Sequence, residues 1–321
     1  MGNQALQTQT TESLPTVLPW KFVIHQYPDT DAWACLWAAL RFVSKDAVSE
    51  IMFVPSGERL DPEYTDGYRV LYMDTGGGDC DQHGKMLERA SSFQLMAEKY
   101  GFARDPGIVD ILELTRATDN VERISRTDIH YYFKGLPYHL TDCKSREVDW
   151  EAAADRVFEV LNVIYSQGKM RARAKKLFQY DGRIQHLKNG LQLAIILQKP
   201  NLREEAFERG ADVVVWTQKH DDGKFYVGIQ VNRRTNLYLG DVMHAIRMAE
   251  AEKRAAVITG SEARELHTIP SIPGWFFHDS GKLIVCGSRS HDLEPHEFTL
   301  LEPHEILTAV RTGLGRWIRP S

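Results

Sequence analysis

The chain has 321 residues, 43% of them hydrophobic and 26% charged, and its formal net charge is −5. This composition excludes collagen-like, coiled-coil and wholly disordered proteins. It also excludes a polycation, so any binding of nucleic acid must depend on a local basic patch. No apolar run approaches the roughly 20 residues of a bilayer-spanning helix, and we expect no membrane association.

The N-terminal segment and the cysteines indicate the cellular setting. Residues 1–18 are rich in Gln and Thr and carry no basic residue before an apolar core, so we interpret them as a disordered lead-in and not as a secretory signal. The four cysteines are far apart in the sequence and form no CxxC pair, which is typical of reduced thiols in the cytosol. We expect a cytoplasmic protein, and the sequence leaves open whether it forms a homodimer.

Strands and helices alternate in the first part of the chain. The predicted elements are, in order, a strand over 21–25, a helix over 31–42, strands over 51–55 and 68–74, and a helix over 91–100. This alternation predicts an α/β domain with a parallel sheet, whose ligands collect at the carboxyl ends of the strands. His25 and Asp74 both stand at such ends.

The pattern changes in the second part of the chain. Helices are predicted over 108–118, 128–135 and 148–178, followed by a hairpin of 211–218 with 224–231, a helix over 239–255 and a hairpin over 274–285. We therefore predict four regions: the lead-in at 1–18, a metal-binding catalytic domain at 19–180, a linker or helix at 181–199, and a smaller, substrate-binding α+β domain at 200–321.

The most informative stretch begins with His25 and continues to Asp29 and Asp31. An imidazole and two carboxylates on one loop at a strand end form the donor mixture that Mn²⁺ or Mg²⁺ prefers. Taken singly, His25 reads as a core histidine and Asp31 as a helix cap. The three together favour a metal site.

Asp74 is followed by Thr75 and three glycines, a run that matches no nucleotide-binding motif. A carboxylate at a strand tip can bridge two cations, and glycines would let a phosphate approach the backbone. Cys80 and His83 come next, but no second pair of ligands at suitable spacing supports zinc.

These motifs resemble those of the DHH phosphoesterase superfamily. The first motif is matched by His25 with Pro-Asp-Thr-Asp-Ala, the second by Asp74, and the third, Asp-His-His, by Asp81-Gln82-His83. Ser91-Ser92 resembles the helix start that follows the third motif, and Asp119 in Ala-Thr-Asp-Asn-Val resembles the fourth. Within the superfamily the chain is most similar to the Myg (melanocyte-proliferating-gene) exonucleases, through Asp119-Asn120, residues 271–281 and Gly287-Ser-Arg-Ser.

The resemblance implies a site with two divalent cations, Mn²⁺ or Mg²⁺. By residue, His25 and Asp29 would bind one cation, Asp31 and Asp119 the other, and Asp74 would bridge them. His83 would ligate a cation or contact the phosphate, which places Asp74 and His83 at the catalytic position. One departure stands out, since Gln82 replaces a histidine that is a metal ligand in the superfamily. Either His83 takes over the role of ligand, or the second cation is held more weakly, or the site binds without catalysis.

Residues that could hold a substrate lie elsewhere in the chain. Seven Lys or Arg residues over 169–188, among them Lys169 and Arg173, could follow a nucleic-acid backbone or could be the solvated face of a helix. Arg289, flanked by Ser288 and Ser290, could grip a phosphate with its planar fork or could lie in a surface turn. Gln82 is a further candidate.

The function predicted from these patterns is that of a metal-dependent phosphodiesterase. The resemblance to the Myg family favours a 3′–5′ exonuclease acting on RNA or short oligonucleotides. Two alternatives stay open: hydrolysis of small linear or cyclic dinucleotides, and a catalytically weak relative that senses nucleotides.

Overall fold

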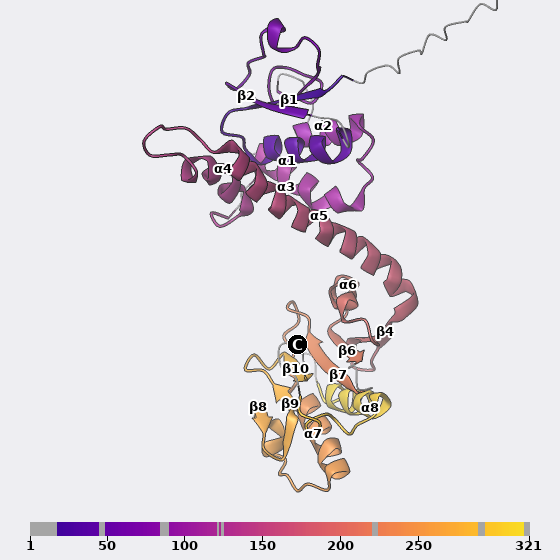
Figure 1. Ribbon diagram of the computed structural model, residues 1–321. Coiled ribbons are helices and arrows are strands. Elements are labelled where there is room, and N and C mark those ends of the chain that lie inside the picture. Colours follow the sequence, from indigo (N-terminus) through magenta and orange to yellow (C-terminus); the bar gives the residue numbers. More distant parts are fainter. Residues whose placement is uncertain are drawn as a thin grey trace, which may run out of the picture. The chain divides into compact units, whose positions relative to one another are not determined.

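The computed structural model describes residues 18–44, 49–83, 90–120, 122, 125–219, 224–287 and 293–317. The chain forms two compact units, Met1–Met170 and Arg171–Ser321, coloured indigo to magenta and pink to yellow in Figure 1. The predicted lead-in lies almost wholly outside the described residues. Within them, no helix has the length and apolarity to cross a membrane.

The first unit contains a three-stranded sheet. Its strands are β1 (Trp20–His25), β2 (Ser49–Val54) and β3 (Arg69–Tyr72), and β1 lies in the middle. Both neighbours pair with β1 in parallel, which confirms the predicted parallel sheet. His25 and the segment after Tyr72 therefore emerge at the same edge.

Helix α1 (Thr30–Ala38) packs against this sheet, and the helices of the unit share one apolar core with it. These helices are α1, the π-helical η1 (Ala39–Val43), α2 (Ser92–Lys99), α3 (Val109–Asp119), α4 (Ile129–His139) and α5 (Trp150–Asp181). Two short 3₁₀ turns lie at η2 (Pro62–Tyr64) and η3 (Pro106–Ile108). Every residue of α1 is buried, and α1 contacts α2, α3 and α4. This central helix is thus surrounded by the elements that carry the candidate site (Figure 1).

The second unit contains a seven-stranded sheet in the order β4-β5-β6-β7-β10-β9-β8. Its strands are β4 (Gly182–His186), β5 (Gln192–Ile196), β6 (Val213–Lys219), β7 (Phe225–Val231), β8 (His267–Ile269), β9 (Ile272–Phe277) and β10 (Leu283–Cys286). Within this sheet, β5 and β6 pair in parallel and the other described neighbours pair antiparallel. Its helices are η4 (Pro200–Leu202), α6 (Arg203–Glu208), α7 (Gly240–Arg254), η5 (Glu262–Arg264) and α8 (Pro303–Leu314).

Apolar side chains cover both faces of this second sheet. Along β5, Leu193 and Ile195 join the core formed with α7 and α8. The alternate residues Ala194 and Ile196 pack with Phe178 from the end of α5 and with α6. This alternation follows from the period of two along a strand, and it accounts for a strand that is apolar at nearly every position.

The segment 181–199, predicted as a linker or helix, is instead the strand pair β4 and β5. The antiparallel pair turns at Asn189-Gly190, where Gly190 has a φ of 83°. Its basic residues obscured the pattern, because the exposed side of β4 carries Arg183. The predicted hairpins of β6 with β7 and of β9 with β10 are confirmed, although residues 221–223 of the first turn lie outside the described part.

Candidate metal centre

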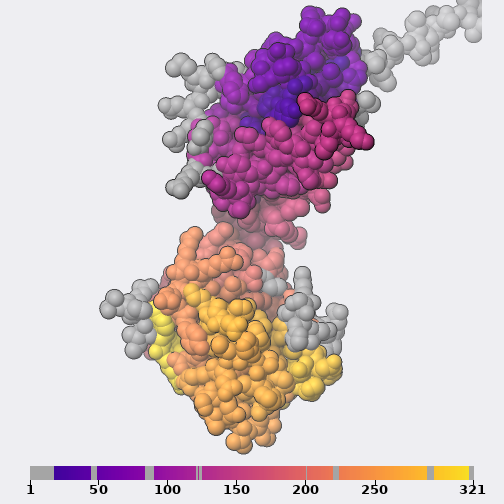
Figure 2. Space-filling model, turned by 90° about the vertical axis from the view of Figure 1, so that its left-hand side faces the viewer, coloured from indigo at the N-terminus to yellow at the C-terminus, as the bar shows by residue number. Residues whose placement is uncertain are grey.

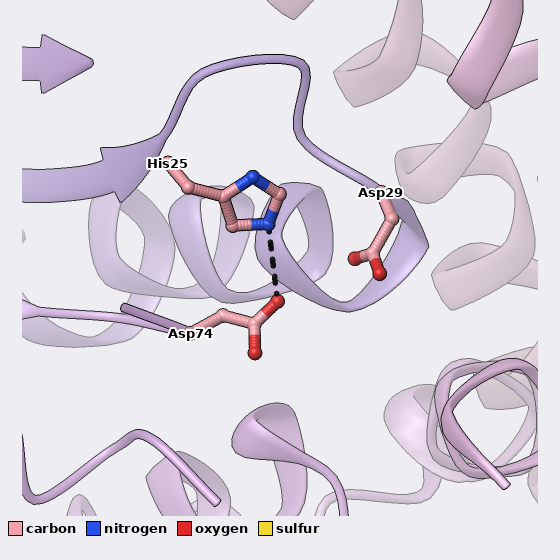
Figure 3. Close-up of side chains that lie close together, drawn as sticks. All are labelled: His25, Asp29 and Asp74. Atoms are coloured by element: carbon pink, nitrogen blue, oxygen red, sulfur yellow. Dashed lines mark ion pairs between the residues drawn. The ribbon is translucent and has the colours of Figure 1, made fainter. Parts of the chain in front are cut away.

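His25 ends β1 and directs its ring toward the strand-end carboxylate Asp74 (Figure 3). Its Nδ1 donates a hydrogen bond to the Gln26 carbonyl at 2.9 Å. This bond fixes the tautomer and leaves Nε2 as the ligating nitrogen. Nε2 lies 3.4 Å from Asp74 Oδ2.

Asp29 caps the N-terminus of α1. Its Oδ1 accepts hydrogen bonds from the backbone N–H groups of Asp31 at 2.9 Å and Ala32 at 3.2 Å. The cap role and the ligand role are compatible, because a carboxylate has two oxygens with about four lone-pair sites. Ligand atoms of Asp29, His25 and Asp74 all lie within 4.8 Å of one another. These three residues form the first candidate set.

Asp74 follows β3 and is 3% exposed. Its φ of 53° lies in the left-handed region, which costs energy for a residue with a side chain but is tolerated by Asp. Its backbone N–H donates to the Cys80 carbonyl at 3.1 Å, and its Oδ1 accepts a hydrogen bond from the Ser92 hydroxyl at 3.1 Å. The unusual backbone thus turns the carboxylate into the space between β1 and α2.

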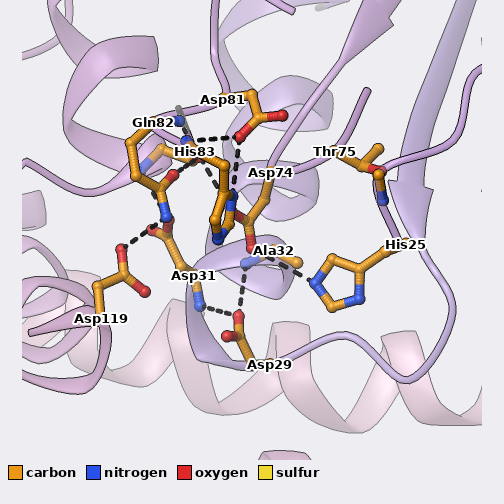
Figure 4. Close-up of polar contacts among 12 residues, drawn as sticks. His25, Asp29, Asp31, Ala32, Asp74, Thr75, Asp81, Gln82, His83 and Asp119 are labelled. Atoms are coloured by element: carbon orange, nitrogen blue, oxygen red, sulfur yellow. Dashed lines mark hydrogen bonds and ion pairs between the residues drawn. The ribbon is translucent and has the colours of Figure 1, made fainter. Parts of the chain in front are cut away.

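Asp81 and His83 form a second candidate set with Asp74. Asp81 Oδ1 accepts hydrogen bonds from the His83 backbone N–H and from His83 Nδ1, both at 2.9 Å, and Oδ2 accepts one from Gly77 N–H at 2.8 Å (Figure 4). His83 Nδ1 also lies 3.5 Å from Asp74 Oδ1. Sequence reasoning did not assign a role to Asp81, although its place at the head of Asp-Gln-His was a signal.

Asp31 is fully buried and joins α1 to α2. Its Oδ2 accepts a hydrogen bond from Ser92 N–H at 2.7 Å, and its Oδ1 accepts one from Phe93 N–H at 3.0 Å. Burial, followed by the negative charges of Asp119 and Asp74, raises the pKa of Asp31 well above its usual range.

Asp119, the last residue of α3, lies beside Asp31 and shares a hydrogen bond with it. Burial and the charges of Asp29 and Asp74 raise the pKa of Asp119 to about 7. Neither Asp31 nor Asp119 belongs to the two candidate sets of described residues. The structure nevertheless brings both into the same group of mutually repelling carboxyls.

Gln82 bonds to two of its neighbours through its side-chain amide. The Ser92 hydroxyl accepts a hydrogen bond from the Gln82 backbone N–H at 3.3 Å, and its single proton is shared between Gln82 Oε1 and Asp74 Oδ1. Because Ser92 occupies the oxygen, the amide nitrogen faces Asp119 Oδ2, at 3.4 Å (Figure 4). Gln82 therefore contacts a carboxylate through its amide nitrogen.

The neighbouring carboxylates also shift the pKa values of His25 and His83. Burial lowers the pKa of His25, but the hydrogen bond with Asp74 and the charges of Asp74 and Asp29 outweigh burial and raise it overall. Burial likewise lowers the pKa of His83, and Asp81 and Asp74 raise it above its usual value. Burial also raises the pKa of Asp74, against the opposing effect of His25.

The donors of this cluster fit divalent cations. Carboxylate oxygens and imidazole nitrogens are the ligands that Mn²⁺ and Mg²⁺ accept. Burial first, and then the charges of neighbouring carboxylates, raise the pKa values of Asp31, Asp74 and Asp119, and bound cations would offset both effects. His25, Asp29 and Asp74 are the residues best placed to hold one cation, and Asp74, Asp81 and His83 to hold another.

Of the predicted substrate residues, Gln82 lies in this cluster, whereas the others are not part of it as described. Lys169 pairs with Asp105 at 2.9 Å within the first unit, and Arg173 is exposed on the part of α5 that belongs to the second unit. Ser288, Arg289 and Ser290 lie outside the described residues. Their roles stay predictions.

Comparison with known proteins finds only low similarity. No protein-family profile and no curated protein matches the chain. Among solved structures, a DHH-domain protein described as a member of a family of ribosomal proteins is 11% identical, with a TM-score of 0.32 over 93% of this chain and 87% of that one. RecJ from Thermus thermophilus, in complex with Mg²⁺, is 11% identical, with a TM-score of 0.27 over 94% of this chain and 50% of RecJ.

A third similar structure is CDC45 from Entamoeba histolytica, which is 8% identical with a TM-score of 0.26 over 92% of this chain and 95% of that one. The chain thus spans half the length of RecJ and most of the length of the other two proteins. Because the TM-scores and identities are this low, the fold and the site of the chain are interpreted from the geometry of the chain itself.

Proposed function

We propose that the protein is a divalent-metal-dependent phosphodiesterase of the DHH type that hydrolyses RNA or short oligonucleotides from the 3′ end. The observation that carries the proposal is Asp74, because its carboxylate belongs to both sets of candidate ligands. A carboxylate shared between two sets is the arrangement that two neighbouring cations require. The motif match of His25, Asp29, Asp31, Asp74 and Asp119 adds the DHH assignment.

The contacts of these residues support a role for each. His25 and Asp29 would hold one Mn²⁺ or Mg²⁺ with Asp74, and Asp81 and His83 would complete the other set. Two such cations would neutralise the charge of a phosphodiester and activate water for attack on phosphorus.

Hydrogen bonds within the cluster keep these donors in place. Asp81 orients His83 through two hydrogen bonds, and Ser92 orients Asp74 and Gln82. With 69% of its side chain accessible, His83 would be free to meet a substrate phosphate.

The test is hydrolysis of end-labelled RNA, DNA and dinucleotides in Mn²⁺, in Mg²⁺ and in a chelator. Asp74→Asn is the decisive variant, because Asn tolerates the left-handed backbone and keeps an oxygen for Ser92. We expect metal-dependent shortening from the 3′ end. Asp74→Asn should lose at least about 100-fold in activity, because mutation of residues that merely orient metal ligands already costs up to about that much.

Asp79→Asn is the matched control, since Asp79 is an exposed carboxylate of the same loop that pairs with Lys99. The control should keep full activity. Equal turnover by Asp74→Asn and the wild type would refute the proposal, and so would a wild type that is inactive on every substrate with metal in excess.

A further inference from the structure

A group of exposed tyrosines lies beside the candidate metal centre. Tyr131, Tyr132 and Tyr138 of α4 are 46%, 44% and 67% exposed, and Tyr27 of the loop before α1 is 47% exposed. The opposite side of α4 is buried, with Phe133 in the core of the first unit. The helix therefore has an ordinary core face and an aromatic outer face. In Figure 2, the side of the molecule that carries α4 in Figure 1 faces the viewer.

The outer face of α4 has a definite pattern. Tyr131, Lys134 and Tyr138 are spaced by three and four residues, so they line one side of the helix. The rise between the two tyrosines is about 10 Å. Gly135 lies on the same exposed side, and a Cβ there would meet no atom within 4 Å. The face thus presents two aromatic rings with a cation and an open space between them.

Both ends of α4 contact the segment 27–30, which includes the candidate metal ligand Asp29. At the N-terminal end, His130 Nδ1 and the buried Thr30 hydroxyl are 2.8 Å apart. At the C-terminal end, the Tyr138 ring stacks on the Tyr27 ring, with centroids 5.2 Å apart and an interplanar angle of 26°. Since Tyr27 lies two residues after His25 and two before Asp29, the aromatic face borders the metal centre.

The conformation of Tyr27 supports a function for its ring. Its φ of 52° places a bulky residue in the left-handed region, where glycine or asparagine would be less strained. The edge of Trp150 also meets this ring, with centroids 5.8 Å apart at 74°. Tyr27 is thus held in place against Tyr138, whose exposure of 67% leaves its other face open to a ligand.

We infer that the outer face of α4, together with Tyr27, is a platform for single-stranded nucleic acid, with one nucleobase stacked on Tyr138 and Lys134 facing a phosphate. Exposed aromatic rings interleaved with basic residues bind single strands in this way, because every base has a π-face and every nucleotide a phosphate. A duplex keeps its bases stacked on one another, so the platform selects unpaired ends. The inference rests on the proposed function and specifies the substrate that the metal centre receives.

The test is equilibrium binding of fluorescein-labelled hexathymidylate to the full chain, measured by anisotropy in a chelator so that no hydrolysis occurs. A hexamer of abasic deoxyribose phosphate with the same charge is the second probe. We expect Tyr138→Ala to weaken binding of hexathymidylate by about 5- to 100-fold, the range for loss of one base-stacking ring, and to leave the abasic hexamer unaffected. Tyr138→Phe keeps the ring and should bind as the wild type does. Tyr64→Ala, at a tyrosine that is 51% exposed near the other end of β1, is the matched control.

Three outcomes would overturn the inference. They are equal binding of the two probes by the wild type, unchanged binding of hexathymidylate by Tyr138→Ala, and a dimer that Tyr138→Ala converts to monomers, which would assign the tyrosines to an interface between copies. Because the assay contains no metal, its result is separate from that of the Asp74→Asn hydrolysis test. Base-selective binding with no hydrolysis would keep the platform and refute the phosphodiesterase.

Discussion

The raised pKa of Asp119 shows that ionising a carboxyl in the metal-free cluster is unfavourable. Its pKa of about 7 means that the folded protein keeps a proton that an unfolded Asp, with a pKa near 3.8, has already lost. The folded state therefore binds more protons than the unfolded state between these values, and the free energy of unfolding falls as the pH rises. Above pH 7 the folded protein bears the whole free-energy cost of ionising Asp119, and below pH 3.8 it bears none of it.

This linkage gives the first prediction. Relative to Asp119→Asn, the chelated wild type should lose stability from about pH 4 to pH 7, at no more than about 1.4 kcal/mol per pH unit. Urea unfolding of both proteins at several pH values measures the difference. A difference that stays constant over this range would show that Asp119 titrates normally.

Gln82 and His83 give the second prediction. His83 belongs to a candidate ligand set, whereas Gln82 donates to Asp119 and does not. We expect His83→Ala to lose at least about 10-fold in activity and Gln82→Ala to keep most of it. A metal titration of the hydrolysis rate distinguishes the two variants.

Gln82→His tests the opposite case, in which the second cation is under-ligated. That variant would then bind Mn²⁺ more tightly than the wild type, because imidazole is a better donor than an amide oxygen. A severe loss in Gln82→Ala together with an active His83→Ala would contradict our assignment.

At the level of elements, Asp31 connects two helices. Both of its oxygens accept backbone N–H groups at the start of α2, whereas Asp29 caps only its own helix. Removing Asp31 leaves two buried donors unsatisfied, at about 1–3 kcal/mol each, and losing a cap costs about 0.5–2 kcal/mol. We predict that Asp31→Ala lowers the free energy of unfolding more than Asp29→Ala does.

Urea unfolding in a chelator at pH 5 is the suitable measurement, because Asp119, whose pKa is raised to about 7, is protonated there and repulsion among the carboxyls is reduced. A larger cost for Asp29→Ala would show that Asp31 does not hold α2.

The sequence predicted the elements whose local pattern is strong. The apolar strand before His25 and the helix after Asp31 were recognised because their burial is nearly complete. The pair β4 and β5 was missed because the basic residues over 169–188 continue into β4, and charge obscured the alternation. The role of Asp81 was missed because it depends on the local turn between Asp74 and His83, and no periodicity reports the conformation of such a turn.

At the level of the whole molecule, the candidate ligands all lie in the unit Met1–Met170. A ligand that binds only the folded state stabilises it, by about 2.7 kcal/mol at a concentration 100 times its Kd. We predict that Mn²⁺ raises the unfolding temperature of the first unit and leaves that of the second unchanged. Differential scanning calorimetry with and without Mn²⁺ measures both transitions, and Asp74→Asn should remove the shift. An equal shift of both transitions would contradict the prediction.

The central claim is that Asp74 is shared between two neighbouring cations, and electron paramagnetic resonance of the Mn²⁺-loaded protein tests it most directly. Two Mn²⁺ ions bridged by one carboxylate interact magnetically, so a titration of the wild type should reach two ions per chain with the spectrum of a coupled pair. Asp74→Asn should give at most one isolated ion, and Asp79→Asn should match the wild type. A wild-type spectrum of isolated Mn²⁺ only, unchanged in Asp74→Asn, would contradict the account.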